Sequence, residues 1–465
     1  MIFETSICAP ATSGSGAISI IRISGPDSYK IAGFIFFPRG NKKFDDLPAN
    51  SVHFGEIRDG SDVLDEVLVS VFKAPNSYTG EDSLEISCHA SPFIQKRILE
   101  LLVEKGAKLA GPGEFTQRAF LNGKMDLTQA EAVADLIAAE NKASHRIALN
   151  QMRGGFSREL AKLRKELLQF TSLIELELDF SEEDVEFANR YALNSLVSNI
   201  LKIINELIGS FKSGNVIKNG VPVAIIGKPN VGKSSLLNRL LNEDKAIVSE
   251  IAGTTRDSIE DTIRIGDITF RFIDTAGIRE SADIVENLGI RKTYQKIEQA
   301  AIILLLADAK DDASSILASY WEIRKQTENK DKHLVLVLNK TDLINQSRIR
   351  ELCVQLNPGD NEQVVEISAK TGMNMDQLHQ VLISASKIGN LDKDSIVISN
   401  IRHYEALKNA AENMDRVSLG LQSGLPSDLL TQDLRQAIYY LGTITGEITT
   451  EEILGNIFSN FCIGK

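Results

Sequence analysis

The segment Gly227-Lys-Pro-Asn-Val-Gly232-Lys233-Ser234 constrains the fold of this chain more than any other feature. It has the spacing G-x-x-x-x-G-K-S, follows the apolar run Val221–Ile226 and precedes a leucine-rich stretch at 235–241. A strand, a glycine-rich loop and a helix in this order let backbone N–H groups surround phosphate oxygens at the positive end of the helix. We expect Lys233 to reach the β- and γ-phosphates and the Ser234 hydroxyl to ligate Mg²⁺. The alternative, a plain glycine turn, is disfavoured because the full motif stands in this context.

Two downstream motifs could complete the phosphate side of such a site. Asp274-Thr-Ala-Gly277 ends the apolar run 270–273, which would place Asp274 near the metal and the Gly277 N–H toward the terminal phosphate. Thr254 and Thr255 could close a switch loop over the metal through a hydroxyl. Each motif is weak alone, because ordinary turns have the same composition.

Two more motifs indicate which base is bound. Asn339-Lys-Thr-Asp342 follows an apolar run at 334–338, and its carboxylate could accept from N–H groups on the guanine edge that adenine does not present. Ser368-Ala-Lys370 would supply a second loop beside the base. These elements, in this order over residues 216–382, resemble the translation-factor-like branch of the P-loop GTPases.

One position departs from the Ras-like pattern, in which a Gln directly after the DxxG glycine orients the attacking water. Here that position is Ile278, which can neither donate nor accept a hydrogen bond, so catalysis needs another group. The acidic stretch 279–286 could supply a carboxylate, although its default interpretation is a solvated switch helix. Asn230 is a candidate ligand for a monovalent cation, although in most P-loops this position is simply a turn residue.

The texture of the chain changes three times and predicts nested domains. Strands are expected at 17–23 and 67–72 and a helix at 92–105, while long amphipathic helices with bundle seams follow and return after 390. Between them lies the alternating α/β texture of a parallel sheet. We therefore predict a multidomain α/β and α protein in which a P-loop GTPase domain is inserted into a split helical domain. The predicted ranges are an N-terminal α/β domain at 1–118, helical parts at 119–215 and 383–465, and the G domain at 216–382.

Composition excludes several classes of protein. The 465 residues are 43% hydrophobic and 25% charged, which suits about three globular domains and excludes a disordered chain. The longest apolar run, 300–307, is too short to cross a bilayer, and the four cysteines are scattered without a CxxC pair. No secretory signal is visible, so a cytoplasmic protein with no membrane partner is expected. The net charge of −12 argues against gripping nucleic acid with the whole surface but permits a local basic patch.

Motifs along the whole chain resemble the MnmE (TrmE) family of tRNA modification GTPases. They are IIRISG at 20–25, NSYTGEDSLE at 76–85, PGEFTQRAFLNGKMDLTQAEAVADLI at 112–137 and the terminal FCIGK at 461–465. The resemblance implies a homodimer that works with an FAD-dependent MnmG-type partner, in a heterotetramer or larger complex. Together they would form an aminomethyl or carboxymethylaminomethyl group at C5 of the wobble uridine, position 34, of certain tRNAs.

The resemblance also implies that the N-terminal domain dimerises and binds a tetrahydrofolate derivative, 5-formyl- or 5,10-methylene-tetrahydrofolate, as the one-carbon source. Motif matching places the folate contacts at Arg22, Glu85, Lys124 and Lys465. A carboxylate suits the amino-pyrimidine edge of a pterin, and cations suit a glutamate tail. The alternative for each is a surface ion pair. Cys462 would lie near this site, with the ordinary role of a small hydrophobe rather than a catalytic one.

For the G domain the resemblance implies activation by K⁺, with Asn230, Ser249, Ile251 and Thr254 around the cation and Ser234 and Thr255 on Mg²⁺. Glu286 matches the carboxylate that orients the water, and it joins Asn230 and Lys233 as the catalytic set. The expected GTP contacts are Asn230, Val231, Gly232, Lys233, Ser234, Ser235, Ser249, Glu250, Ile251, Ala252, Gly253, Thr254, Thr255, Asp274, Thr275, Ala276, Gly277, Asn339, Lys340, Thr341, Asp342, Ser368, Ala369 and Lys370.

The sequence leaves open whether the chain itself contacts RNA. A locally basic helical stretch could contact RNA or could be a solvated face with intrahelical ion pairs; its cations are Lys142, Arg146, Arg153, Arg158, Lys162, Arg164 and Lys165. The alternative functions are a ribosome-assembly GTPase of the Era or Der type and a membrane-remodelling or septin-like scaffold. The first carries a basic C-terminal RNA-binding domain or a second G domain, and neither is expected in this chain. The second needs a lipid-facing segment or long coiled coil, whereas the helices here are expected to form a bundle core, so both alternatives are disfavoured.

Overall fold

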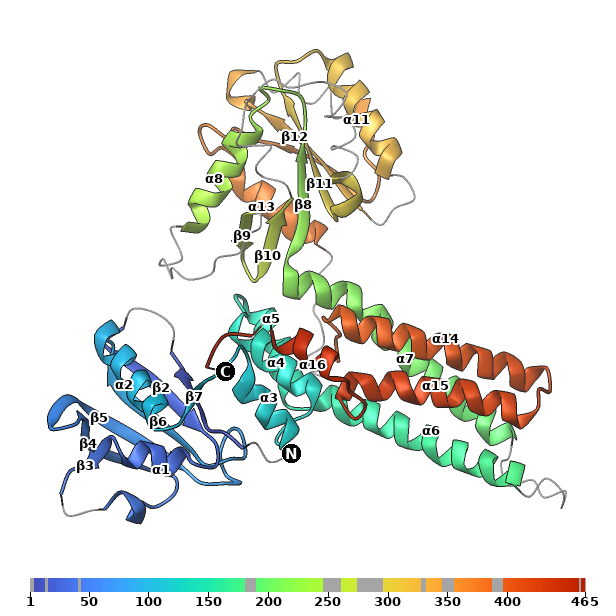
Figure 1. The fold of residues 1–465 in the computed structure, drawn as a ribbon. Coiled ribbons are helices and arrows are strands. Elements are labelled where there is room, and N and C mark those ends of the chain that lie inside the picture. Colours follow the sequence, from blue (N-terminus) through green and yellow to red (C-terminus); the bar gives the residue numbers. More distant parts are fainter. Residues whose placement is uncertain are drawn as a thin grey trace. The chain divides into compact units, whose positions relative to one another are not determined.

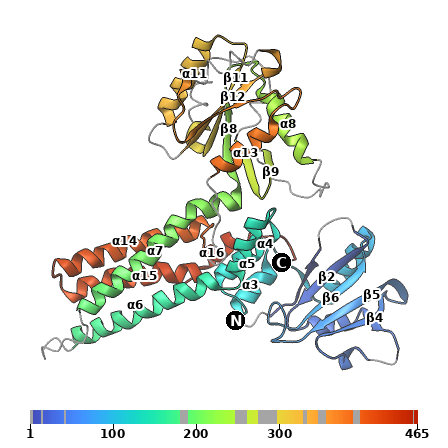
Figure 2. The ribbon, with the colours of Figure 1, turned by 180° about the vertical axis from the view of Figure 1, so that it is seen from behind.

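The structure is a computed structural model that describes residues 4–12, 16–40, 43–179, 190–245, 261–273, 296–327, 332–344, 355–386, 396–459 and 461–464. The chain divides into two compact units, drawn in Figures 1 and 2. The first comprises residues 1–138, 148–205 and 405–465, and the second comprises 139–147 and 206–404. A discontinuous first unit interrupted by an α/β unit is the nested arrangement that the sequence predicts. The domain boundaries at 118, 215 and 382 stay predictions.

A mixed seven-stranded sheet forms the N-terminal part of the first unit, in the order β3-β4-β5-β6-β2-β1-β7. Neighbouring strands are antiparallel except for β1 and β7, which are parallel. The strands are β1 (Ile7–Pro10), β2 (Ile18–Ser24), β3 (Phe36–Pro38), β4 (Ser51–Asp59), β5 (Asp62–Phe72), β6 (Ser83–His89) and β7 (Lys108–Leu109). A short 3-10 helix, η1 (Phe44–Asp46), precedes β4.

One face of this sheet is apolar and is covered by helices α1 (Ser28–Gly33) and α2 (Pro92–Glu104). Side chains alternate between the two faces of a strand, so Ile21 and Ile23 of β2 face the core, as do Leu84 and Ile86 of β6. The residues between them project from the opposite face. Both predicted strands and the predicted helix of this region are confirmed within one or two residues at each end, except that β5 begins five residues before the predicted strand.

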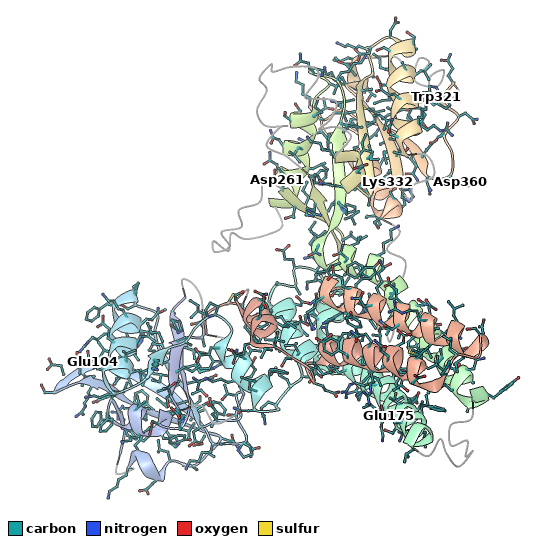
Figure 3. The ribbon with its side chains drawn as sticks, turned by 45° about the vertical axis from the view of Figure 1, so that its right-hand side comes forward. Glu104, Glu175, Asp261, Trp321, Lys332 and Asp360 are labelled. Carbon is teal, nitrogen blue, oxygen red and sulfur yellow. The ribbon has the colours of Figure 1, made fainter. Side chains whose placement is uncertain are left out.

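Helices make up the rest of the first unit. They are α3 (Glu114–Leu121), α4 (Leu127–Ile137), α5 (Lys142–Met152), α6 (Gly155–Asp179), α7 (Arg190–Asn219), α14 (Ile401–Gln422), α15 (Ser427–Thr445) and α16 (Glu451–Phe458), of which α5, α7 and α14 extend into the second unit. The long helices α6 and α15 lie side by side in both views. Arg435 of α15 pairs with Glu175 of α6, labelled in Figure 3, at 2.7 Å.

The second unit is built on a six-stranded sheet in the order β13-β12-β11-β8-β10-β9, parallel except for the β9–β10 hairpin. The strands are β8 (Val221–Ile226), β9 (Asp261–Ile265), β10 (Ile268–Phe272), β11 (Ile302–Asp308), β12 (His333–Asn339) and β13 (Glu362–Glu366). Helices α8 (Lys233–Lys245) and α13 (Met375–Ala385) pack on one face and α11 (Ala313–Thr327) on the other. The predicted parallel sheet of an α/β domain is confirmed, with helices on both faces and the loops after β8, β11 and β12 at the carboxyl edge of the sheet.

Lys332, labelled in Figure 3, fixes the approach to β11. Its ammonium donates to the carbonyl oxygens of Ile297, Glu298 and Ala300 at 2.5, 2.8 and 2.6 Å. Carbonyl groups at the end of a helix lack intrahelical partners, so a cation there satisfies them. The start of β11 is thereby held in a defined position.

A short segment far upstream in the sequence also belongs to the second unit. Asn141 donates through Nδ2 to the Thr269 hydroxyl at 3.1 Å, and Arg264 donates to the carbonyl of Glu140 at 3.2 Å. Thr269 and Arg264 are opposite each other in the β9–β10 ladder. Residues 140 and 141 therefore form hydrogen bonds with both members of one cross-strand pair of the hairpin.

Candidate functional site

The loop between β8 and α8 needs glycine at both positions of the motif. Gly227 has φ +150°, and a Cβ there would lie 3.2 Å from the carbonyl carbon of Leu306 and closer still to its oxygen. Gly232 has φ +102°, and its Cβ would collide with the side-chain amide of Asn339. Side chains at either position would push the loop away from the two strands that support it. The backbone is thus free to face a phosphate group.

Lys233 begins α8 and turns its ammonium back over the loop. The Nζ atom donates to the carbonyl oxygens of Gly227 at 2.7 Å and Lys228 at 2.8 Å. Burial, followed by the charge of Lys296, lowers the pKa of Lys233. An anion beside the ammonium would oppose both effects, because an opposite charge favours the charged form. The Lys233 ammonium is therefore already held at the loop where a phosphate group would bind.

Asn339 joins the phosphate loop to the two loops of the predicted base site. Its Nδ2 donates to Val231 O at 2.8 Å, and its Oδ1 accepts from Ala369 N at 3.0 Å. The side chain is buried, and Thr341 adds a bond from its hydroxyl to Ile367 O at 2.9 Å. Asp342 remains exposed, so its carboxylate is accessible to a ligand. A buried amide with both ends paired fixes the spacing of these loops.

Several predicted contacts lie outside the described residues. They are the switch residues Ser249, Glu250, Ile251, Ala252, Gly253, Thr254 and Thr255, the motif Asp274, Thr275, Ala276 and Gly277, the carboxylate Glu286, and Lys465. The structure brings together described members around the ends of β8 and β12, namely Asn230, Val231, Gly232, Lys233, Ser234, Asn339, Lys340, Ser368 and Ala369. The remaining described members follow these directly in the chain: Ser235 in α8, Thr341 and Asp342 after Lys340, and Lys370 after Ala369.

A second candidate site lies on the face of the N-terminal sheet opposite to helices α1 and α2. Arg22 of β2 and Glu85 of β6 are cross-strand partners, and Arg22 donates through Nε and Nη2 to Glu85 Oε1 at 3.0 and 2.7 Å. The guanidinium carbon lies 5.4 Å from the centre of the Tyr78 ring and 5.6 Å from that of Phe115. Both charged side chains remain partly exposed. An accessible ion pair between aromatic rings can bind a flat, polar heterocycle.

The C-terminal segment borders this ion pair. Arg22 Nη1 donates to Gly464 O at 3.4 Å, and Gly113 N donates to Cys462 O at 3.3 Å. Ile463 forms an isolated β-bridge with Pro112. The thiol of Cys462 is exposed, unlike those of the other described cysteines. The structure therefore places Cys462 two residues from an atom bonded to Arg22.

Lys124 contacts the connection between β5 and β6. Its ammonium donates to the carbonyl of Pro75 at 2.9 Å, and its stem passes 3.2 Å from the position of a Cβ on Gly80. Both partners belong to the 73–82 connection between β5 and β6. The described contacts thus bring Arg22 and Glu85 together and tie Lys124 to the loop beside them.

Arg118 belongs to neither site predicted from the sequence, yet it is the largest fully buried side chain in the described part of the chain. Its guanidinium donates to Glu114 at 2.9 Å, Glu81 at 3.3 Å and the carbonyl of Thr5 at 2.8 Å. Glu81 also accepts from Ser24 at 3.0 Å, and Ser24 lies two residues after Arg22 in β2. Arg118 therefore fixes the turn that carries the candidate site. An arginine four residues after a glutamate, inside an otherwise apolar helix face, was the available signal.

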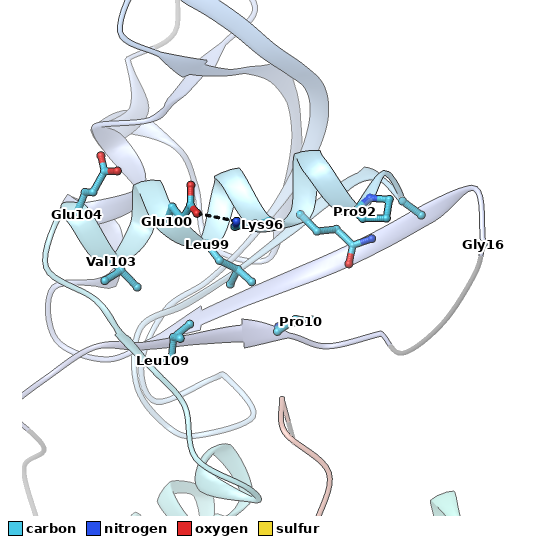
Figure 4. A pocket seen from close by; sticks show the side chains of 11 residues that line it. Pro10, Gly16, Pro92, Lys96, Leu99, Glu100, Val103, Glu104 and Leu109 are labelled. Atoms are coloured by element: carbon cyan, nitrogen blue, oxygen red, sulfur yellow. Dashed lines mark ion pairs between the residues drawn. The ribbon is translucent and has the colours of Figure 1, made fainter. Parts of the chain in front are cut away.

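A cavity of about 1040 Å³ lies on the helix-covered side of the same sheet, between α2 and the β1–β7 edge (Figure 4). Lys96 and Glu100 of α2 form an ion pair beside it at 3.7 Å. Most of its lining is apolar, and no residue singled out by the sequence falls on it. The lining residues are Pro10, Gly16, Ala90, Pro92, Gln95, Lys96, Leu99, Glu100, Val103, Glu104 and Leu109.

The cations of the basic helical stretch fall in both units. Lys142 and Arg146 belong to the second unit, whereas the cations from Arg153 onward belong to the first. Arg164 pairs with Glu447, beyond the end of α15, rather than with a neighbour in its own helix. A single RNA-binding face stays a prediction.

Within the described ranges, no helix is long and apolar enough to cross a membrane.

Two family models together match nearly the whole chain. The model described as the GTP-binding protein TrmE N-terminus matches residues 6–124, and the MnmE helical domain model matches residues 127–462. A relative named tRNA modification GTPase MnmE from Bacteroides fragilis (strain YCH46) is 53% identical over 99% of this chain and 100% of its own length. This chain belongs to the MnmE family. The resemblance inferred from the motifs is confirmed.

Other MnmE relatives match equally well along their length. The MnmE of Flavobacterium psychrophilum is 52% identical and is covered completely, as is this chain. Among solved structures, a variant of Era from Aquifex aeolicus bound to GDP.AlF4- is 28% identical, with 42% of this chain and 66% of that chain covered and a TM-score of 0.26. The MnmE assignment rests on the full-length relatives and the family models.

Proposed function

We propose that this chain is a K⁺-activated GTPase that, with an FAD-dependent MnmG-type partner, modifies C5 of the wobble uridine in certain tRNAs. The product is the 5-aminomethyl or 5-carboxymethylaminomethyl group, and the carbon comes from a tetrahydrofolate derivative. The observation that carries the proposal is the full-length match to relatives named tRNA modification GTPase MnmE, 53% identical from end to end. We infer a cytoplasmic homodimer, with the domain boundaries given above.

The G domain would bind GTP through the loops that Asn339 joins. Lys233 would exchange its carbonyl partners for the β- and γ-phosphates, and Asp342 would accept from the guanine edge. Ser234 and Thr255 would hold Mg²⁺, which neutralises charge on the phosphate oxygens. Adenine does not present these N–H donors, so it would leave the Asp342 carboxylate unpaired. Guanine would be selected because it avoids that cost.

Asn230 would contribute to the K⁺ site. Its φ of +63° puts the loop in a left-handed turn, and amide and carbonyl oxygens are the ligand type that a hard monovalent cation accepts. The remaining oxygens would come from Ser249, Ile251 and Thr254. A cation there supplies the positive charge that other GTPases obtain from an arginine. Glu286 would orient the water that Ile278 cannot orient.

The N-terminal site would bind the folate between Arg22, Glu85, Lys124 and Lys465. Glu85 would accept from the amino-pyrimidine edge of the pterin, while Tyr78 and Phe115 keep Arg22 in place. Charge-assisted bonds of this kind are about twice as strong as neutral ones. Cys462 would stand beside this site without a catalytic role.

The deciding experiment is mass-spectrometric nucleoside analysis of tRNA from cells that lack this protein. Loss of the wobble modification, restored by the wild-type gene but not by Lys233→Ala, is the expected result. Normal wobble uridine in the deletion strain would refute the function, and defective ribosome assembly instead would favour an Era-like role.

The GTPase part is tested separately with purified protein. Hydrolysis should be faster in KCl than in NaCl, and Glu286→Ala should bind nucleotide yet lose turnover. Equal rates in both salts would remove K⁺ from the proposal, and full turnover by Glu286→Ala would assign the water to another group.

A further inference from the structure

An ion pair links the end of β11 to the loop that follows β12. Asp308 is the last residue of β11, and its Oδ2 lies 2.6 Å from Lys340 Nζ. Its other oxygen accepts from the backbone N–H of Lys310 at 3.0 Å. The Asp308 side chain is only 15% exposed, so the carboxylate is fixed by both of its oxygens.

Lys340 makes a second bond that reaches the phosphate loop. The same Nζ atom donates to the carbonyl oxygen of Asn230 at 3.0 Å. Lys340 and Asn230 both have a left-handed backbone, with φ of +64° and +63°, which residues other than glycine seldom adopt. An ammonium held between a carboxylate and this carbonyl supports two such turns at once.

We propose that Asp308 is a positioning residue that sets the predicted guanine loop and the predicted cation-binding turn together. Its carboxylate holds the Lys340 ammonium against the carbonyl of Asn230, so displacement of one loop displaces the other. This inference rests on the proposed function, because it assigns guanine binding to the 339–342 loop and K⁺ binding to Asn230. It adds a residue that none of the nucleotide motifs contains.

The charge on Asp308 is secure near neutral pH. Burial raises the pKa of this carboxyl, but the hydrogen bonds from Lys340 and from the Lys310 backbone outweigh burial, and the net shift is downward. The register strengthens the argument, because Asp308 faces Asn339 across the β11–β12 ladder. Asn339, whose side-chain amide joins the loops, and Asp308, whose charge holds Lys340, are thus neighbours in the sheet.

The test replaces Asp308 by asparagine in the full-length chain. Asparagine keeps an oxygen for the Lys310 N–H and removes only the charge that holds Lys340. We expect at least about fivefold weaker binding of a fluorescent GDP analogue and a K⁺ concentration for half-maximal hydrolysis raised at least about fivefold, the lower end of typical coupling between sites. The control is Asp312→Asn, which removes an exposed carboxylate from the same connection, directly before α11, where asparagine and aspartate are equally favourable residue types.

A double-mutant cycle with Lys340→Met separates positioning from general support of the fold. Methionine keeps the apolar stem and lacks the ammonium, so Asp308→Asn should add little to either constant in that background. Equal constants for Asp308→Asn and Asp312→Asn, or an undiminished effect in the Lys340→Met background, would overturn the proposal. If the wild type proves indifferent to K⁺, the proposed function loses its cation, while the GDP affinities still decide whether Asp308 acts through Lys340.

Discussion

Gly464 is the position at which one added methyl group should disable the N-terminal site and leave the G domain intact. It has φ +93°, and a Cβ there would lie 2.9 Å from the carbonyl carbon of Pro10, closer to its oxygen, and 3.3 Å from the Cα of Ala11. All three atoms are backbone, so none can rotate away. Gly464→Ala must therefore move the C-terminal segment from its place beside Arg22.

The magnitude follows from what holds this segment. A left-handed backbone costs a residue other than glycine roughly 1–2 kcal/mol. The bonds from Gly113 N to Cys462 O and from Arg22 to Gly464 O contribute about 0.5–1.5 kcal/mol each, and both are long, at 3.3 and 3.4 Å. Strain and overlap together exceed what these contacts supply. The segment should detach, while the free energy of unfolding falls by no more than about 3 kcal/mol.

The assay is calorimetric titration of the full-length protein with 5-formyl-tetrahydrofolate. Gly464→Ala should bind at least about tenfold more weakly, or about 1.4 kcal/mol, with an unchanged intrinsic rate of GTP hydrolysis. Gly60→Ala is the matched control, because Gly60 has φ +63° in the turn between β4 and β5 and no atom within 4 Å of its Cβ position. Wild-type folate affinity in Gly464→Ala would refute the claim that the C-terminal segment completes the site.

Three further outcomes follow from buried groups. Arg118→Met should lower the free energy of unfolding of the N-terminal part by about 3–5 kcal/mol in urea, because two carboxylates lose their buried partner; a loss below 1 kcal/mol would contradict this. Asn141→Ala should lower the free energy of unfolding of the second unit in urea by about 1–2 kcal/mol, because it removes a helix cap and the bond to β10. Asn141→Asp should restore the cap alone. Burial raises the pKa of Cys8 to about 12 and, with a smaller contribution from a nearby carboxylate, that of Cys88 to about 11, so iodoacetamide at pH 8 should label Cys462 well before either, as peptide mass spectrometry would show.

Local sequence signals predicted the second unit more fully than the first. The run Val221–Ile226 is β8 to the residue, because a strand buried on both faces needs a continuous apolar run that ends in the glycine loop. The same logic located β11 and β12 and the loops after them. The neighbours of Arg22 show the limit: Glu85 is 63 residues away and Gly464 is 442 away. Periodicity reports which face of an element is buried and not what covers it.

The nested arrangement has its own physical support where the chain enters and leaves the second unit. Phe211 of α7 stacks on Tyr404 of α14 with ring centres 4.5 Å apart, and Ser210 accepts from the backbone N–H of Ile398 at 3.1 Å. Gly214 allows the closest approach, since a Cβ there would lie 2.7 Å from the carbonyl carbon of Ile398. These contacts hold the two ends of the unit side by side, which is the condition under which a folded domain can be inserted into another. Because closing a longer loop adds only about 0.6 kcal/mol per doubling, the size of the inserted domain costs the surrounding helices little. The close approach at Gly214 and the stacking of Phe211 on Tyr404 therefore support the insertion more than its length opposes it.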